Sequence, residues 1–166
     1  MFTRELKKTS KLQRRKTKSL SKLDTYLESF KAEGTTKWEV NYGGNLTIQR
    51  LVTFTPELAA KILSDFNNNN RPLNKGNLKF LSKELLSGNW IPNGDSITFD
   101  TNGDCNNGQH RLKVIVDTNT TLDILTITNL SKEAFKTIDT GKTRSGSDVL
   151  SIEGIANSSH HSSVVK

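Results

Sequence analysis

Apolar side chains recur at two different spacings along this chain of 166 residues, and the spacing changes where the secondary structure is expected to change. Alternating apolar and polar positions over residues 37–53, with a pair of glycines at the centre, predict a β-hairpin. Helical spacing then begins at Pro56, with Thr55 as the expected N-cap, and ends at the asparagine run 67–70. The pattern thus predicts a hairpin followed by a helix.

The rest of the chain continues with helices and strands of similar length. Leucines at helical spacing over residues 74–87 predict a second helix, which Gly88 ends, and Trp38 and Trp90 are expected to pack in the core or on the hairpin. The leucines expected to point inward from this helix are Leu78, Leu81, Leu85 and Leu86. The remaining predicted elements are a hairpin over 96–106 with an Asn-Gly turn, a helix over 109–117, a strand over 122–128, a short helix over 131–135 and a helix over 146–153. This order indicates an α+β (mixed α/β) fold, with helices packed on a small mixed sheet.

Charge divides the chain into a basic arm and a nearly neutral remainder. Residues 1–22 hold nine basic residues and one acid, a net charge of +8, whereas the whole chain carries +7. Loosely spaced leucines predict one or two helices in an arm over residues 1–32, ahead of the hairpin over 33–54 and a main domain over 55–166. A basic arm attracts polyanions, and the alternative is a solubilising or partner-binding tail. The residues expected to contact nucleic acid are Arg4, Lys7, Lys8, Lys11, Arg14, Arg15, Lys16 and Lys18.

Composition narrows the class of protein further. The single cysteine, Cys105, allows no internal disulfide, and it is expected to be a small core residue. No apolar run is long enough to span a membrane, and the basic N-terminal segment lacks the apolar core of a secretion signal, so a cytoplasmic protein is expected. His160 and His161 lack suitable partners, so no structural metal is expected.

The residues Gly108-Gln109-His110-Arg111, here called the GQHR turn, carry the strongest chemical signal. They follow a predicted strand and begin a predicted helix, whose first turn presents unpaired backbone N–H groups and the positive end of the helix dipole. Gly108 would let a ligand approach the backbone, His110 can donate or accept a hydrogen bond near neutral pH, and Arg111 offers two parallel donors to a phosphate. The alternative is structural: Arg111 pairs with a local acid such as Asp104, and His110 is satisfied within the turn.

Several ordered pieces between residues 55 and 157 resemble the ParB/sulfiredoxin superfamily, whose phage and mobile-element members carry a helix-opening Asp-Gly-Gln-His-Arg. The pieces are Asn70-Arg71-Pro72-Leu73, Ser87-Gly88-Asn89-Trp90 with Asn93-Gly94, Ile97-Thr98-Phe99-Asp100, Gly108-Gln109-His110-Arg111-Leu112, Ile138-Asp139-Thr140-Gly141 with Arg144, and Asp148-Val149-Leu150 with Gly154. Their shared order is more specific than any single piece. Asn107 stands where the family usually has an acid, which would favour binding without turnover.

The resemblance implies that the GQHR turn cradles the phosphates of a nucleoside triphosphate with Mg²⁺. Members of the superfamily bind CTP and DNA, use ATP, or phosphorylate free serine, so the fold alone leaves the activity open. Arg71, Lys75 and Arg144 are candidates for further contacts to the phosphates, and the alternative for each is a solvated surface charge. Members usually continue with further helices, which predicts a C-terminally shortened domain here.

Three functions follow as competing hypotheses. The leading one is a module of phage or mobile-element origin that binds nucleotide or the DNA backbone. The second is a Mg-nucleotide-dependent phosphotransferase or a nuclease, with Asp104, His110 and Asp139 as catalytic candidates and Glu133 as a further carboxylate. The third is an inhibitor that contacts a host or defence protein.

Overall fold

The structure is a computed structural model that describes residues 21–42, 45–68, 70–137, 145–152 and 154. The chain forms two compact units, Met1–Lys132 and Glu133–Lys166. The first unit contains the sheet and the GQHR turn. The second contains most of a short 3-10 helix, η1 (Lys132–Lys136), and α5 (Gly146–Ile152), which agree with the predicted helices over 131–135 and 146–153.

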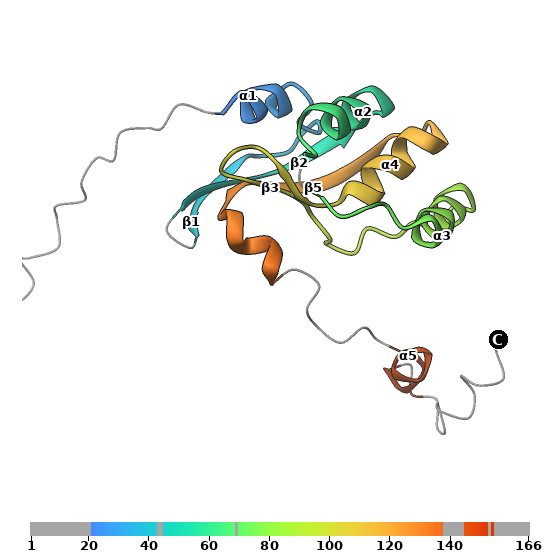
Figure 1. The fold of residues 1–166 in the computed structure, drawn as a ribbon. Coiled ribbons are helices and arrows are strands. Elements are labelled where there is room, and N and C mark those ends of the chain that lie inside the picture. Colours follow the sequence, from blue (N-terminus) through green and yellow to red (C-terminus); the bar gives the residue numbers. More distant parts are fainter. Residues whose placement is uncertain (1–20, 43–44, 69, 138–144, 153, 155–166) are drawn as a thin grey trace, which may run out of the picture. The chain divides into compact units, whose positions relative to one another are not determined.

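The first unit is a mixed α/β fold built on a five-stranded sheet with the order β1-β2-β5-β3-β4 (Figure 1). The strands are β1 (Trp38–Tyr42), β2 (Asn45–Phe54), β3 (Ile97–Asp100), β4 (Cys105–Asn107) and β5 (Leu122–Leu130). Strand β5 runs antiparallel to β2 and parallel to β3, so the sheet is mixed. Both predicted hairpins, β1-β2 and β3-β4, are confirmed.

Among the described residues of the first unit, four helices accompany this sheet, and their limits follow from local signals. They are α1 (Lys22–Glu28), α2 (Pro56–Asp65), α3 (Lys75–Leu86) and α4 (Gln109–Thr118). Thr55 caps α2 by accepting a hydrogen bond from the Leu58 N–H at 3.2 Å, and Asn74 caps α3 in the same way from the Asn77 N–H at 2.9 Å. Beyond α3, Gly88 has a positive φ of 72°, which glycine adopts at helix ends without steric cost.

One hydrophobic core lies between the sheet and three of these helices. Its members come from α1, α2, α4 and strands β2 to β5, and α1, α2 and α4 cover the same face of the sheet (Figure 1). The buried core residues are Leu23, Leu27, Val52, Phe54, Leu58, Ala59, Ile62, Ile97, Phe99, Cys105, Leu112, Ile115 and Ile124. Helix α3 has no fully buried side chain and packs on α4, and its leucines Leu78, Leu81 and Leu85, which were expected to point inward, are half-buried.

Residues 21–32, which were predicted as part of the basic arm, belong to the fold, whereas residues 1–20 lie outside the described residues. Leu23 and Leu27 are almost completely buried in the core. Backbone hydrogen bonds join this segment to β2, from the Ala32 N–H to the Leu51 carbonyl at 2.9 Å and from the Thr53 N–H to the Phe30 carbonyl at 2.8 Å. Ser21, which the sequence analysis did not single out, is the N-cap of this helix: its side chain accepts a hydrogen bond from the Asp24 N–H at 3.0 Å.

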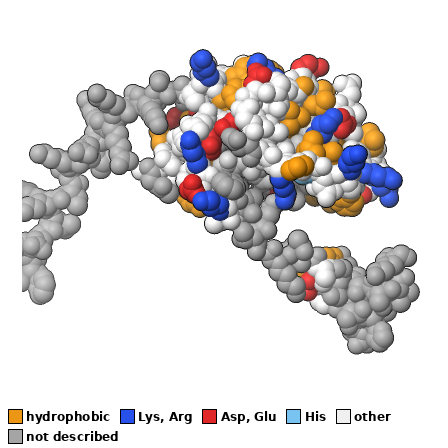
Figure 2. Space-filling view, viewed as in Figure 1, with side chains coloured by type: hydrophobic (Ala, Val, Ile, Leu, Met, Phe, Trp, Pro, Cys, Tyr) orange, Lys and Arg blue, Asp and Glu red, His pale blue; other side chains and the backbone are white. Residues whose placement is uncertain are grey.

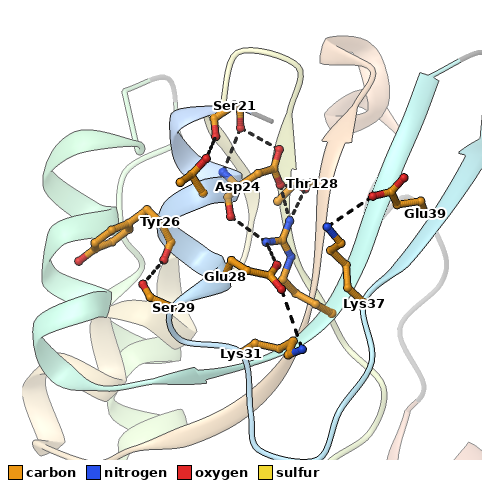
Figure 3. Close-up of polar contacts among 11 residues, drawn as sticks. Ser21, Asp24, Tyr26, Glu28, Ser29, Lys31, Lys37, Glu39 and Thr128 are labelled. Atoms are coloured by element: carbon orange, nitrogen blue, oxygen red, sulfur yellow. Dashed lines mark hydrogen bonds and ion pairs between the residues drawn. The ribbon is translucent and has the colours of Figure 1, made fainter. Parts of the chain in front are cut away.

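A buried ion pair fixes α1 to the sheet. The guanidinium of Arg50, on β2, has no solvent exposure and forms ion pairs with Asp24 and, at 3.2 Å, with Glu28. It also donates to the Asp24 carbonyl at 2.9 Å, and the Thr128 hydroxyl donates to the Asp24 carboxylate. Figure 3 shows the Asp24 side chain of α1 beside Thr128 of β5, with Glu28 further along the same helix. Because the charges of Arg50 and Asp24 are both removed from water, the loss of either residue would leave the other as an uncompensated buried charge.

The opposite face of the sheet carries exposed apolar side chains at the edge strand. Trp38, Val40 and Tyr42 alternate along β1 and pair with β2 residues that point away from the core. Trp38 is 59% exposed and Tyr42 67%, so of the two expected places for Trp38, the core or the hairpin, the structure excludes the core and puts the residue on the hairpin. On α3, Leu86 is likewise exposed rather than inward. No described helix is both long enough and apolar enough to cross a membrane.

Candidate functional site

The GQHR turn begins α4 directly after β4, as the sequence predicted. Gly108 is the N-cap residue and has a φ of 106°, a left-handed conformation that residues with a Cβ rarely adopt. A Cβ built on it would lie 2.7 Å from Cγ1 of Ile97 on β3. Packing against Ile97 and the backbone conformation therefore require glycine here, independently of any ligand.

Gln109 holds the loop that precedes α3. Its side chain is buried, and its Nε2 donates a hydrogen bond to the Arg71 carbonyl at 2.8 Å. The amide of Asn67 donates to Gln109 Oε1 at 3.5 Å, and that of Asn70 donates to the Cys105 carbonyl. The asparagine run thus supplies amides that fasten this loop to β4 and to the GQHR turn.

His110 holds the first residue of the α3 segment. Its Nε2 accepts a hydrogen bond from the backbone N–H of Asn74, the N-cap of α3, at 2.9 Å. Burial lowers the pKa of His110 below its ordinary value, and the positive charge of Arg71 lowers this pKa further. Because only a neutral imidazole nitrogen can accept this bond, both effects favour the form that the fold uses.

Arg111 holds the loop that follows α3. Its Nη1 donates to the Asp95 carbonyl at 2.7 Å and its Nη2 donates to the Ser96 carbonyl at 2.9 Å. The expected partner in the structural interpretation was Asp104, but the Asp104 carboxylate accepts a hydrogen bond from the amide of Asn68 at 3.0 Å. The structural interpretation thus expected a carboxylate as the partner of Arg111, whereas the guanidinium donates to two main-chain carbonyls.

Three consecutive side chains therefore hold both ends of one surface segment. Gln109 and His110 bind the chain before α3, and Arg111 binds the chain after it. We call these three residues the α3 clamp. Sequence reasoning gave these residues either to a ligand or to local partners within the protein. It did not predict these loops as partners, because they are up to 38 residues away in the sequence and no local pattern links them to the turn.

The first turn of α4 nevertheless retains features that attract an anion. Helices α1, α2 and α3 each have a side-chain N-cap, whereas Gly108 provides none for α4. Arg71 and Lys75 are exposed and form no ion pair with any described residue. Arg71 lies close enough to His110 for its positive charge to lower the pKa of the imidazole. An uncapped helix start beside an arginine can bind a phosphate.

The other predicted site residues are placed as follows. Burial raises the pKa of the Cys105 thiol to about 12, so this residue is a core thiol, as predicted. Glu133 lies in the second unit and forms an ion pair with Lys136. Asp139 and Arg144 fall outside the described residues, as do His160 and His161 and all eight predicted nucleic-acid-binding residues of the arm. Among the described residues, no three His, Cys, Asp or Glu side chains are grouped so that they could hold a metal ion.

Sequence reasoning missed two sets of residues near the turn. Asn67 and Asn70 were read for ending a helix and Asn74 for beginning one, and none was expected to organise the loop with its amide or backbone, as the structure shows. Lys79 and Lys83 were not considered, although the spacing of four residues from Lys75 was visible in the sequence. Comparison with protein-family models, curated proteins and solved structures found no match for this chain.

Proposed function

We propose that the chain is a phosphate-binding module of the ParB/sulfiredoxin type that takes a nucleotide or a DNA backbone at the start of α4, in the cytoplasm of a cell that carries a phage or mobile element. The observation that carries the proposal is the uncapped first turn of α4 beside Arg71, described above. Backbone N–H groups and one guanidinium together match the oxygen atoms of a phosphate.

In this proposal, the side chains of the GQHR turn position the site and the backbone binds the ligand. Gln109, His110 and Arg111 already bind main-chain groups, so they fix the loops around the helix start. Arg71 remains for the ligand, because its backbone carbonyl is held by Gln109 while its guanidinium is exposed. Arg144 and the basic arm are further contacts in the proposal, the arm through counterion release from nucleic acid.

Calorimetric titration with CTP, ATP and GTP in the presence of Mg²⁺ tests this proposal. Arg71→Gln should weaken binding at least about tenfold, as expected for the loss of a charge-assisted hydrogen bond. Lys113→Gln is the matched control, because Lys113 is already paired with Asp117 on the same helix, α4. Arg111→Ala is a poor probe, since it also releases the loop at Asp95 and Ser96.

Two results would count against the proposal: no measurable binding of any nucleotide or of DNA, or equal affinity in the wild type and the Arg71→Gln variant. Phosphate release measured in the same samples separates binding from turnover. Arg144→Gln, titrated in parallel, shows whether the second predicted arginine contributes to the same ligand.

A further inference from the structure

Helix α3 carries a row of lysines along one side. Lys75, Lys79 and Lys83 follow one another at intervals of four residues, which places them on the same face of a helix, and all three are exposed. Basic side chains gather over α3 in the space-filling view (Figure 2). We call these three residues the lysine stripe, and Arg71 stands one further interval of four before it.

The charge of the lysine stripe is not neutralised within the described part of the chain. None of its three ammonium groups forms an ion pair with a described residue. Other lysines of the fold do have carboxylate partners: Lys31 lies 3.9 Å from Glu28 and Lys61 lies 2.7 Å from Asp65. Helix α3 contains a single acid, Glu84, so it carries a net positive charge of its own.

Stability of the fold does not account for this arrangement. Lys75 is the first residue of α3, where the helix dipole disfavours a positive charge, and the first turn contains no acid. Phe80, next to Lys79 in the sequence, is 59% exposed, and no side chain of α3 belongs to the hydrophobic core. A charged, outward-facing helix with an exposed aromatic residue is more typical of a binding surface than of a packing element.

We propose that the lysine stripe is a docking surface for the phosphate backbone of duplex DNA. Its three charges span about 12 Å along the helix axis at 1.5 Å per residue, and a duplex offers one negative charge for about every 1.7 Å of its length. The clamp at both ends of α3 holds the charges in a fixed row, which suits a stiff duplex better than a flexible single strand. The inference rests on the proposed function in that it assigns DNA as a ligand, but it uses a different surface.

Salt dependence of DNA binding by the full chain tests this inference. A labelled duplex of random sequence, about 20 base pairs long, is titrated by fluorescence anisotropy at salt concentrations between about 50 and 200 mM. Each phosphate contact contributes about 0.9 to the slope of log K against log salt. The variant Lys75→Gln/Lys79→Gln/Lys83→Gln should therefore have a slope about 2 to 3 units less steep than the wild type.

Two further variants control for charge and for folding. Lys31→Gln/Lys61→Gln/Lys113→Gln removes the same formal charge from lysines that already have carboxylate partners, and should leave the slope close to that of the wild type. Lys75→Arg/Lys79→Arg/Lys83→Arg keeps the charge of the stripe and should keep the slope. Unfolding curves of all three variants confirm that each is folded.

Equal slopes in the stripe variant and the control variant would overturn the inference. An equal loss with a single-stranded oligonucleotide would overturn the assignment to duplex DNA. The nucleotide titration with Arg71→Gln reports on the start of α4 independently. If the chain binds no nucleotide but the stripe variant changes the slope, the inference about the lysine stripe stands and the proposed nucleotide site is wrong. If the chain binds nucleotide and the stripe variant leaves the slope unchanged, only the inference about the stripe is wrong.

Discussion

The Nε2 atom of His110 accepts a hydrogen bond from the backbone N–H of Asn74 at 2.9 Å, and this bond joins the start of α4 to the start of α3. The two residues are 36 positions apart in the sequence. Since protonated Nε2 is a donor, the bond exists only while the imidazole is neutral. This contact between α3 and α4 therefore depends on pH.

The free energy of unfolding should consequently fall in mildly acidic solution. Burial and Arg71 lower the pKa of folded His110 below the value of 6.5 expected for the unfolded chain. A lowered pKa means that the stabilisation is fully present above pH 6.5 and is lost as the pH falls through the folded value. Urea unfolding between about pH 5 and 8 measures it. His110→Gln keeps a neutral acceptor and should show a flatter profile, and identical profiles would contradict the assignment because His160 and His161 remain in both chains.

Gly108→Ala should destabilise the fold by about 2–4 kcal/mol, because the new methyl group meets Ile97 at 2.7 Å and the residue must also adopt a left-handed backbone. Gly94→Ala separates the two causes. Gly94 has a φ of 82° but nothing within 4 Å of its Cβ position, so this change should cost only about 1 kcal/mol. Chemical unfolding of both variants measures the two losses of stability. Equal losses would show that the Ile97 side chain moves away from the new methyl group without a loss of stability.

Arg50→Met should cost about 3–5 kcal/mol, because it leaves the buried carboxylate of Asp24 without its cation. Adding Asp24→Asn removes the unpaired charge and keeps an oxygen that accepts from Thr128 and a side chain near Ser21. The double variant should therefore be more stable than Arg50→Met alone. A double-mutant cycle in urea measures the coupling, and simple additivity would argue against the pair.

The thiol of Cys105 should be almost unreactive in the native protein. Burial raises its pKa to about 12, so the thiolate that attacks a disulfide reagent is scarce at pH 8, and access is blocked as well. Absorbance after mixing with an aromatic disulfide should show full reaction only in denaturant. Rapid stoichiometric labelling of the folded chain would place the thiol at the surface.

Local signals in the sequence were sufficient for most of the secondary structure. Thr55 and Pro56 set the start of α2, the Asn102-Gly103 turn set the β3-β4 hairpin, and Gly108 set the start of α4, even though that helix contains β-branched residues. These signals act over a few residues, where backbone geometry and capping decide the outcome.

Contacts between residues that are distant in the sequence could not be predicted from such local signals. Arg50 and Asp24 are 26 residues apart, and without this pair the charged residues of α1 looked like those of a free arm. Gln109, His110 and Arg111 were recognised as important, but their partners are main-chain groups of two loops, and main-chain groups carry no signature in a sequence. The exposure of Trp38 likewise depends on which face of the sheet the helices cover.

The attachment of α3 has a consequence for how this surface can change over evolution. The helix gives no side chain to the core: it packs on α4, and three neighbouring residues outside it bind the loops at both of its ends. Substitutions on its outer side therefore cost the fold little, so its sequence is free to diverge while the scaffold stays constant. Related chains would therefore be expected to differ first in the exposed residues of the segment 75–86.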